Sequence, residues 1–132
     1  MTRNVRVEHK CDDLFEIDVR GHRLHVDQPL ADGGGDAAPT PTELFVVSLA
    51  SCVAFYARRY LARHQLRTEG LRVEASYEMA EHPTRVGAIT LSIAVPPSTP
   101  DARRAALLAV ASHCTVHNSL EHPPEVSVRL AA

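Results

Sequence analysis

The stretch at residues 40–64, TPTELFVVSLASCVAFYARRYLARH, constrains the fold most, because it predicts one long helix around which the rest of the chain must be arranged. Thr40 is a preferred N-cap residue, Pro41 suits the first helical position, and Glu43 completes a T-x-x-E capping box. Residues 44–56 leave almost no polar face, and a helix that is apolar on all sides is normally buried. We therefore expect a long, buried central helix.

Cys52 lies at the midpoint of this stretch, so we expect its side chain inside the molecule. Positive charge gathers over the last turns, at Arg58, Arg59, Arg63 and His64, where the helix dipole favours cations. The uninterrupted apolar run is shorter than the roughly 20 residues that a bilayer-spanning helix needs, so we expect no membrane segment.

Length and composition narrow the class of protein. With 132 residues, the chain is long enough for one domain with a real core, which we take as residues 1–132. A formal net charge of -2, 5% aromatic residues and the absence of a basic cluster argue against nucleic-acid binding. The N-terminal MTRNVRVEHK lacks the apolar segment of a secretory signal peptide, so we expect a cytoplasmic protein.

Before the long helix, alternating residues predict a three-stranded antiparallel meander. The strands cover residues 3–9, 14–19 and 22–27, with Arg20 and Gly21 in a hairpin turn. The glycine-rich segment at residues 30–39, LADGGGDAAP, has no apolar pattern and predicts a mobile loop. We interpret this loop either as a plain linker or as a lid over a site.

After the long helix, Gly70 is expected to act as the stop signal, and the rest of the chain predicts a β-hairpin, two shorter helices and a final strand. The hairpin strands are residues 71–79 and 88–95, the amphipathic helix is residues 101–112, one or two helical turns follow at 115–120, and the last strand is residues 125–130. One face of the hairpin should pack on the long helix, which gives an α+β fold.

Three cysteines occur, and an odd number suits single catalytic, metal-binding or buried thiols better than a disulfide framework. Cys114 precedes a predicted helix, whose N–H groups and dipole favour a thiolate, so it should be the more ionisable of the two helix-associated cysteines. Cys52 has no such help from its own helix, so reactivity there needs a cation or donor from elsewhere in the fold. From residue type alone, each cysteine is most often a small core hydrophobe.

Histidines beside Cys114 raise the alternative of a zinc site. Its best version would bring Cys52, Cys114 and His113 together in space. No two cysteines have the close spacing of a typical zinc pair, so we predict no metal and no cofactor.

Two motifs are shared with a known family: P-x-E-L followed by an apolar run and LASC at residues 41–52, and H-C-x-V-x-x-S-L at residues 113–120. On these motifs the chain resembles the OsmC/Ohr family of organic hydroperoxide reductases and osmotically induced proteins. RGHRLHVDQP, at residues 20–29, is most similar to the OsmC-like branch. The resemblance implies an OsmC-like α+β fold, an intertwined homodimer, and two cysteines that face each other at its interface.

The resemblance also implies a thiol peroxidase. Cys52 would attack an organic hydroperoxide and become a sulfenic acid, and Cys114 would resolve it as a Cys52–Cys114 disulfide. An external dithiol would then reduce this disulfide.

The sequence departs from the peroxidase branch at two activating positions. The family glutamate, ten residues before the cysteine, is replaced by Thr42, and the family arginine falls at about Cys11. Supporting roles would then pass to Glu43, Arg20, Arg23 or His113. The alternative is a non-enzymatic ligand-binding protein or a thiol or zinc sensor whose cysteines line an apolar interface pocket.

Overall fold

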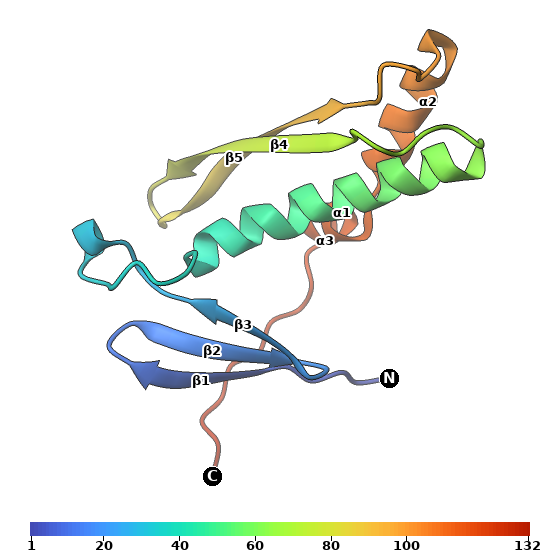
Figure 1. Cartoon of the computed structure of the whole chain (residues 1–132). Coiled ribbons are helices and arrows are strands. Elements are labelled where there is room, and N and C mark those ends of the chain that lie inside the picture. The colour runs from blue at the N-terminus through green and yellow to red at the C-terminus, as the bar shows by residue number, and fades with distance from the viewer. The chain divides into compact units, whose positions relative to one another are not determined.

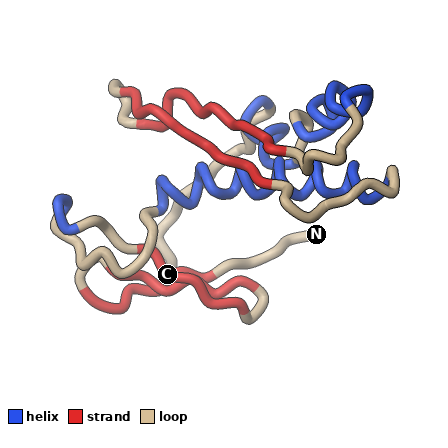
Figure 2. The backbone as a smooth tube through the Cα atoms, turned by 45° about the horizontal axis from the view of Figure 1, so that its top comes forward, coloured by secondary structure: helices blue, strands red, loops and turns tan.

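The computed structural model describes residues 1–132 and has the α+β fold expected from the sequence. The chain forms two compact units, residues 1–45 and residues 46–132. Figure 1 follows the chain from the blue N-terminal strands to the red C-terminal segment. The strands, red in Figure 2, belong to two separate sheets, one with three strands and one with two.

The first unit contains the predicted meander. Its antiparallel strands are β1 (Arg6–Cys11), β2 (Leu14–Val19) and β3 (His22–Val26), in that order. The β2–β3 turn uses Arg20 and Gly21, both with positive φ, as the hairpin prediction required. The first strand is displaced from its predicted range: β1 begins at Arg6 and continues to Cys11. The third strand, β3, ends one residue earlier than predicted.

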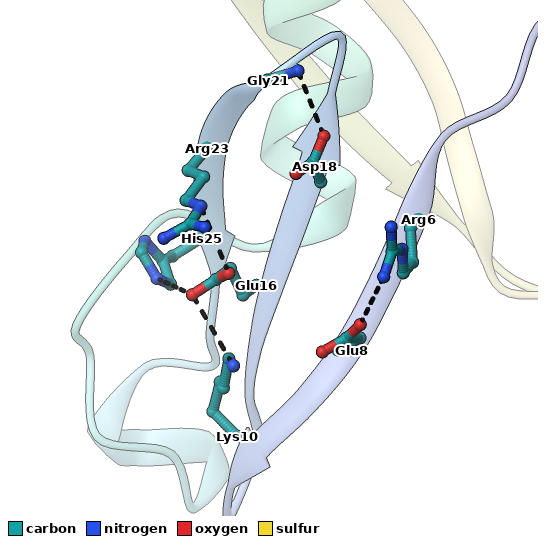
Figure 3. A network of polar contacts seen from close by, with 8 residues as sticks. All are labelled: Arg6, Glu8, Lys10, Glu16, Asp18, Gly21, Arg23 and His25. Carbon is teal, nitrogen blue, oxygen red and sulfur yellow. Dashed lines mark hydrogen bonds and ion pairs between the residues drawn. The ribbon is translucent and has the colours of Figure 1, made fainter.

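Alternation along the strands separates an apolar face of this sheet from a charged one. Ile17 pairs with Val7 on one side and Leu24 on the other. On the opposite face, Glu16 forms ion pairs with Lys10, Arg23 and His25 at 3.6–3.8 Å (Figure 3). These contacts are partly exposed to water, so each contributes little, at most about 1 kcal/mol.

The glycine-rich segment is closed by hydrogen bonds to residues at the end of β3. The buried carboxylate of Asp27 accepts hydrogen bonds from the backbone N–H groups of Gln28, at 2.7 Å, and Ala37, at 3.0 Å. The hydrogen bond from Ala37, followed by that from Gln28, lowers the pKa of Asp27. A 3₁₀ turn, Leu30–Asp32, lies inside this closure. A Cβ at Gly34 would lie 2.1 Å from the carbonyl oxygen of Gln28, which explains a glycine there.

The central helix α1 (Pro41–Arg63) begins as predicted. Thr40 and Glu43 form the capping box, because the Glu43 N–H donates to Thr40 Oγ1 at 3.0 Å and the Thr40 N–H donates to Glu43 Oε1 at 2.8 Å. This exchange satisfies two N–H groups that the helix itself leaves unpaired.

The helix ends differently from the prediction. Gln65 has a φ of 55°, and the N–H groups of Gln65 and Leu66 donate back to Ala62 and Leu61. This is a Schellman motif with a non-glycine residue in the left-handed position. The prediction that Gly70 ends the helical segment is therefore wrong; Gly70 has a φ of 91° and comes just before β4 (Arg72–Ala80).

The second unit packs a hairpin, two short helices and most of α1 around one core. β4 pairs antiparallel with β5 (Arg85–Ala94), and α2 (Asp101–Ala111) and α3 (Thr115–Glu121) follow. The buried cluster comprises Leu49, Val53, Ala57, Tyr60, Leu61, Leu107, Ala111 and Cys114, and Val73, Ile89, Leu91 and Ile93 of the hairpin pack against it. The predicted contact of the hairpin with the long helix is confirmed.

Two expectations fail in the single chain. The first is that α1 is buried all round: Val47 is 52% exposed and Phe55 is 54% exposed. The second is a last strand at residues 125–130, where the structure has no strand and Val126, Val128 and Leu130 are 78%, 91% and 98% exposed. An alternating segment becomes a strand only when another strand accepts its hydrogen bonds, and none does so here.

With 23 residues, α1 is long and apolar enough to cross a membrane by length and composition alone, so the apolar run does not exclude a span. The core helix of a folded protein meets the same criterion. Five residues of α1 belong to the buried cluster described above.

Candidate functional site

The site is a pair of free thiols in the second unit, contributed by Cys52 of α1 and Cys114 at the start of α3. Their side chains are close enough for the Cys52 thiol to raise the pKa of Cys114. Cys114 is a fully buried member of the core cluster, whereas Cys52 is partly exposed and packs against that cluster. The pair therefore has one thiol that solutes can reach and one that is shielded from water.

The turn between α2 and α3 positions Cys114. Its backbone is extended, at φ -71° and ψ 159°, and it forms the N-cap of α3. Its Sγ accepts a hydrogen bond from the His117 N–H at 3.3 Å. The His117 ring is held in turn by the carbonyl oxygen of Ser112 and by Glu121 Oε1, the latter at 3.0 Å. These contacts hold the sulfur of Cys114 in one place.

Burial raises the pKa of the Cys114 thiol. The N–H of His117 acts in the opposite direction, and the neighbouring Cys52 thiol raises this pKa further. The prediction that Cys114 is readily ionisable is therefore wrong. The reason is physical: the N–H groups of His117 and Val116, at the start of a seven-residue helix, do not compensate for removing a thiolate from water.

Tyr56 is a member of the site that the sequence reasoning missed. Its hydroxyl and the Thr115 Oγ1 are hydrogen-bonded at 2.9 Å. Tyr56 lies one turn after Cys52 on α1, and Thr115 follows Cys114, so this bond ties together the two elements that carry the thiols. The i, i+4 spacing between Cys52 and Tyr56 was the available signal, since such residues lie on the same helix face.

The other predicted residues are distributed over both units. Arg20 and Arg23 lie in the first unit, where Arg23 pairs with Glu16 and Arg20 has no ion-pair partner (Figure 3 shows Arg23). Glu43 also lies in the first unit and is used in the capping box of α1. His113 lies in the second unit, where it is exposed at the end of α2.

Both departure positions lie in the first unit. Cys11 is exposed at the end of β1, and Thr42 is partly exposed in the first turn of α1. No three histidine, cysteine, aspartate or glutamate side chains are grouped so that they could hold a metal ion. The zinc set of Cys52, Cys114 and His113 therefore does not assemble. Two adjacent free thiols can instead alternate between a dithiol and a disulfide.

Comparison with known proteins agrees with this architecture. A protein from Psychrobacter arcticus 273-4, named for osmotic stress induction and a detoxification response, has a structure similar to this chain, with a TM-score of 0.82, 24% identity, and 90% of this chain and 88% of that chain covered. An OsmC-like protein from Mycoplasma pneumoniae gives a TM-score of 0.78 with 13% identity, covering 93% of this chain and 89% of its own.

A third similar structure is an organic hydroperoxide resistance protein OsmC from Legionella pneumophila, with a TM-score of 0.68, 19% identity and coverages of 91% and 89%. At such identities these likenesses show the fold alone. No curated protein matches the chain. The family model described as OsmC-like protein matches residues 33–129, which include both thiols of the site. The chain belongs to the OsmC-like family.

Proposed function

We propose that this protein is a thiol peroxidase that reduces organic hydroperoxides. The observation that supports this most directly is the pair of neighbouring free thiols, one partly exposed and one fully buried. The name of the Legionella relative, an organic hydroperoxide resistance protein, agrees with this chemistry.

In the proposed cycle the thiolate of Cys52 attacks the terminal oxygen of ROOH. The O–O bond breaks, Cys52 becomes a sulfenic acid, and the alkoxide takes a proton and leaves as ROH. The thiol of Cys114 then attacks the sulfenic sulfur, which forms the Cys52–Cys114 disulfide and releases water. An external dithiol reduces this disulfide by exchange and is itself oxidised, which suits a reducing compartment such as the cytoplasm.

The division of roles follows from exposure. A peroxide must reach the attacking thiol, which favours the partly exposed Cys52. The resolving thiol needs only to lie beside the sulfenic acid, which suits the buried and rigidly held Cys114. Its raised pKa is compatible with this role, because its proton can leave as the disulfide forms.

Activation of Cys52 calls for a cation, for which the sequence offers Arg20 and Arg23. The Arg23 guanidinium is already paired with Glu16, whereas Arg20 has no carboxylate partner. Arg20→Gln should then slow peroxide reduction more than Arg23→Gln does. The opposite order would transfer the role to Arg23.

We also propose that the protein works as an intertwined homodimer. The exposed side chains Val47 and Phe55 leave an apolar stripe on α1, and residues 125–130 alternate without a pairing strand. A second copy of the chain would cover the apolar stripe on α1 and would supply a strand that pairs with residues 125–130. Light scattering that gives a monomer mass at every concentration would contradict this assignment.

The decisive experiment for the peroxidase is thiol counting before and after one equivalent of cumene hydroperoxide, followed by peptide mapping. We expect two thiols to disappear as a Cys52–Cys114 disulfide. Cys114→Ser should consume a single equivalent and stop as a sulfenic acid, and Cys52→Ser should consume none. Cys11→Ser is the matched control and should behave like the parent chain.

A ligand-binding protein without catalysis remains the second candidate, because Thr42 and Cys11 stand where the peroxidase branch has glutamate and arginine. The ligand-binding function would be favoured if the number of free thiols in the folded, reduced protein did not fall after cumene hydroperoxide is added.

A further inference from the structure

A groove runs along the C-terminal half of α1 and shares Tyr56 with the thiol site. It has a volume of about 360 Å³ and is lined by Tyr56, Arg59, Tyr60, Arg63, His64 and Val110. All of these residues belong to the second unit, and the volume lies within the range of about 300–1,000 Å³ that is typical of small-molecule sites.

The charges that line this groove are all of one sign. Arg59 and Arg63 form no ion pair with any carboxylate, and no acidic residue contributes to the lining. The Arg59 guanidinium only rests 6.0 Å from the centre of the Phe55 ring. By contrast, Arg72 and Arg104 elsewhere in this unit pair with carboxylates at 3.2 Å and 3.1 Å. Two unneutralised guanidinium groups therefore meet at a groove that lacks a counter-ion.

The floor of the groove is aromatic and apolar. The centre of the Tyr60 ring lies 4.4 Å from that of the His64 ring, and Val110 of α2 also lines the groove. Tyr60 is 8% exposed, and its hydroxyl is buried without any hydrogen-bond partner among the protein groups. A buried hydroxyl of this kind is costly when it is unpaired. The Tyr60 hydroxyl is therefore a third polar group, beside the two arginine side chains, that the chain itself leaves without a partner.

Favourable interaction with the helix dipole does not fully account for these arginines. The last four carbonyl groups of α1, those of Tyr60 through Arg63, already accept hydrogen bonds from His64, Gln65 and Leu66. Their partial negative charge is satisfied within the Schellman motif. The guanidinium groups of Arg59 and Arg63 are thus not needed to cap the helix.

We propose that this groove binds an organic monocarboxylate with an apolar body. The carboxylate would bind Arg59 and Arg63, since guanidinium groups hold carboxylates through paired charge-assisted hydrogen bonds. The apolar body would lie over Tyr60 and Val110. The proposal does not rest on the peroxidase function, because Arg59 and Arg63 have no part in the proposed thiol cycle and binding can be measured without peroxide.

The test is a titration of the reduced full-length protein with sodium octanoate, followed by calorimetry and by NMR shifts of the Tyr60 and Val110 signals. We expect saturable binding that shifts these signals. Acetate, which has the charge without the body, and 1-octanol, which has the body without the charge, should each bind at least about tenfold more weakly.

Variants separate specific binding from general attraction to a cationic helix. Arg59→Gln and Arg63→Gln should each weaken octanoate binding about tenfold, the loss expected for one charge-assisted hydrogen bond. Arg58→Gln is the matched control, because Arg58 is an exposed neighbour on the same helix that does not line the groove. Circular dichroism should confirm that all three variants remain folded.

Three results would overturn the proposal. The first is no saturable octanoate binding at millimolar concentrations. The second is an equal loss of binding in Arg58→Gln, which would show non-specific electrostatics. The third is octanol binding as tightly as octanoate, which would remove the role of the arginines. Because no peroxide enters the titration, any of these results leaves the peroxidase proposal standing.

Discussion

The buried thiol of Cys114 should make the protein lose stability as the pH rises above about 8.5, which is the ordinary pKa of a free cysteine. Burial raises the pKa of Cys114 in the folded chain. Above the ordinary value the unfolded chain therefore releases the proton first. Since the unfolded state then binds fewer protons than the folded state, the free energy of unfolding falls with rising pH.

The size of the effect is bounded by the single proton involved. Between the unfolded and the folded pKa of Cys114, the free energy of unfolding should fall by at most about 1.4 kcal/mol per pH unit. Cys114 is 0% exposed, so solvent screening should not reduce this slope strongly. Below pH 8 the contribution of Cys114 should be constant, because the thiol is neutral in both states.

Urea unfolding of the reduced protein at several pH values between about 7.5 and 9.5, below the titration of tyrosine and lysine, measures this slope. Cys114→Ser should flatten it, because serine keeps an acceptor for the His117 N–H but does not ionise in this range. Cys11→Ser is the control, since Cys11 is exposed. An unchanged slope in Cys114→Ser, or a slope lost in Cys11→Ser, would refute the reasoning.

Three other substitutions test separate features. Gln65→Gly should stabilise the chain by up to about 1 kcal/mol in urea unfolding, because glycine adopts the positive φ at the end of α1 without strain, and a loss of stability would contradict this. Gly34→Ala should destabilise by about 1–3 kcal/mol, because its Cβ would overlap the carbonyl of Gln28; an unchanged unfolding midpoint would mean that the turn is looser than described. Phe55→Asp should shift the proposed dimer toward monomer in light scattering, whereas an unaltered mass would place the interface elsewhere.

Local patterns in the sequence identified most of the secondary structure. The capping box of Thr40 and Glu43 marked the start of α1, and alternation predicted β2 at its observed bounds, Leu14–Val19. Such features depend on neighbours within a few residues, so they can be read from the chain itself. The resemblance in the two cysteine motifs likewise led to the family that the comparison with the family model shows.

Features that depend on distant groups were the ones that the sequence misjudged. The helix-start position of Cys114 favoured a thiolate, but the surrounding core raises its pKa. The sequence did not indicate the partner of Tyr56, because Thr115, whose Oγ1 lies 2.9 Å from the Tyr56 hydroxyl, is 59 residues away in the chain. Alternation at residues 125–130 predicted a strand that has no strand to pair with in one chain.

The sequence by itself thus determined the order and type of most helices and strands, which residues carry thiols, and the family to which the chain belongs. Only the tertiary structure decided that Cys114 is shielded from water while Cys52 is partly exposed, and that Arg59 and Arg63 line one groove. The physical reason is that burial, desolvation and the meeting of side chains arise from contacts between segments far apart in the chain, and residue spacing along a single helix or strand does not contain them.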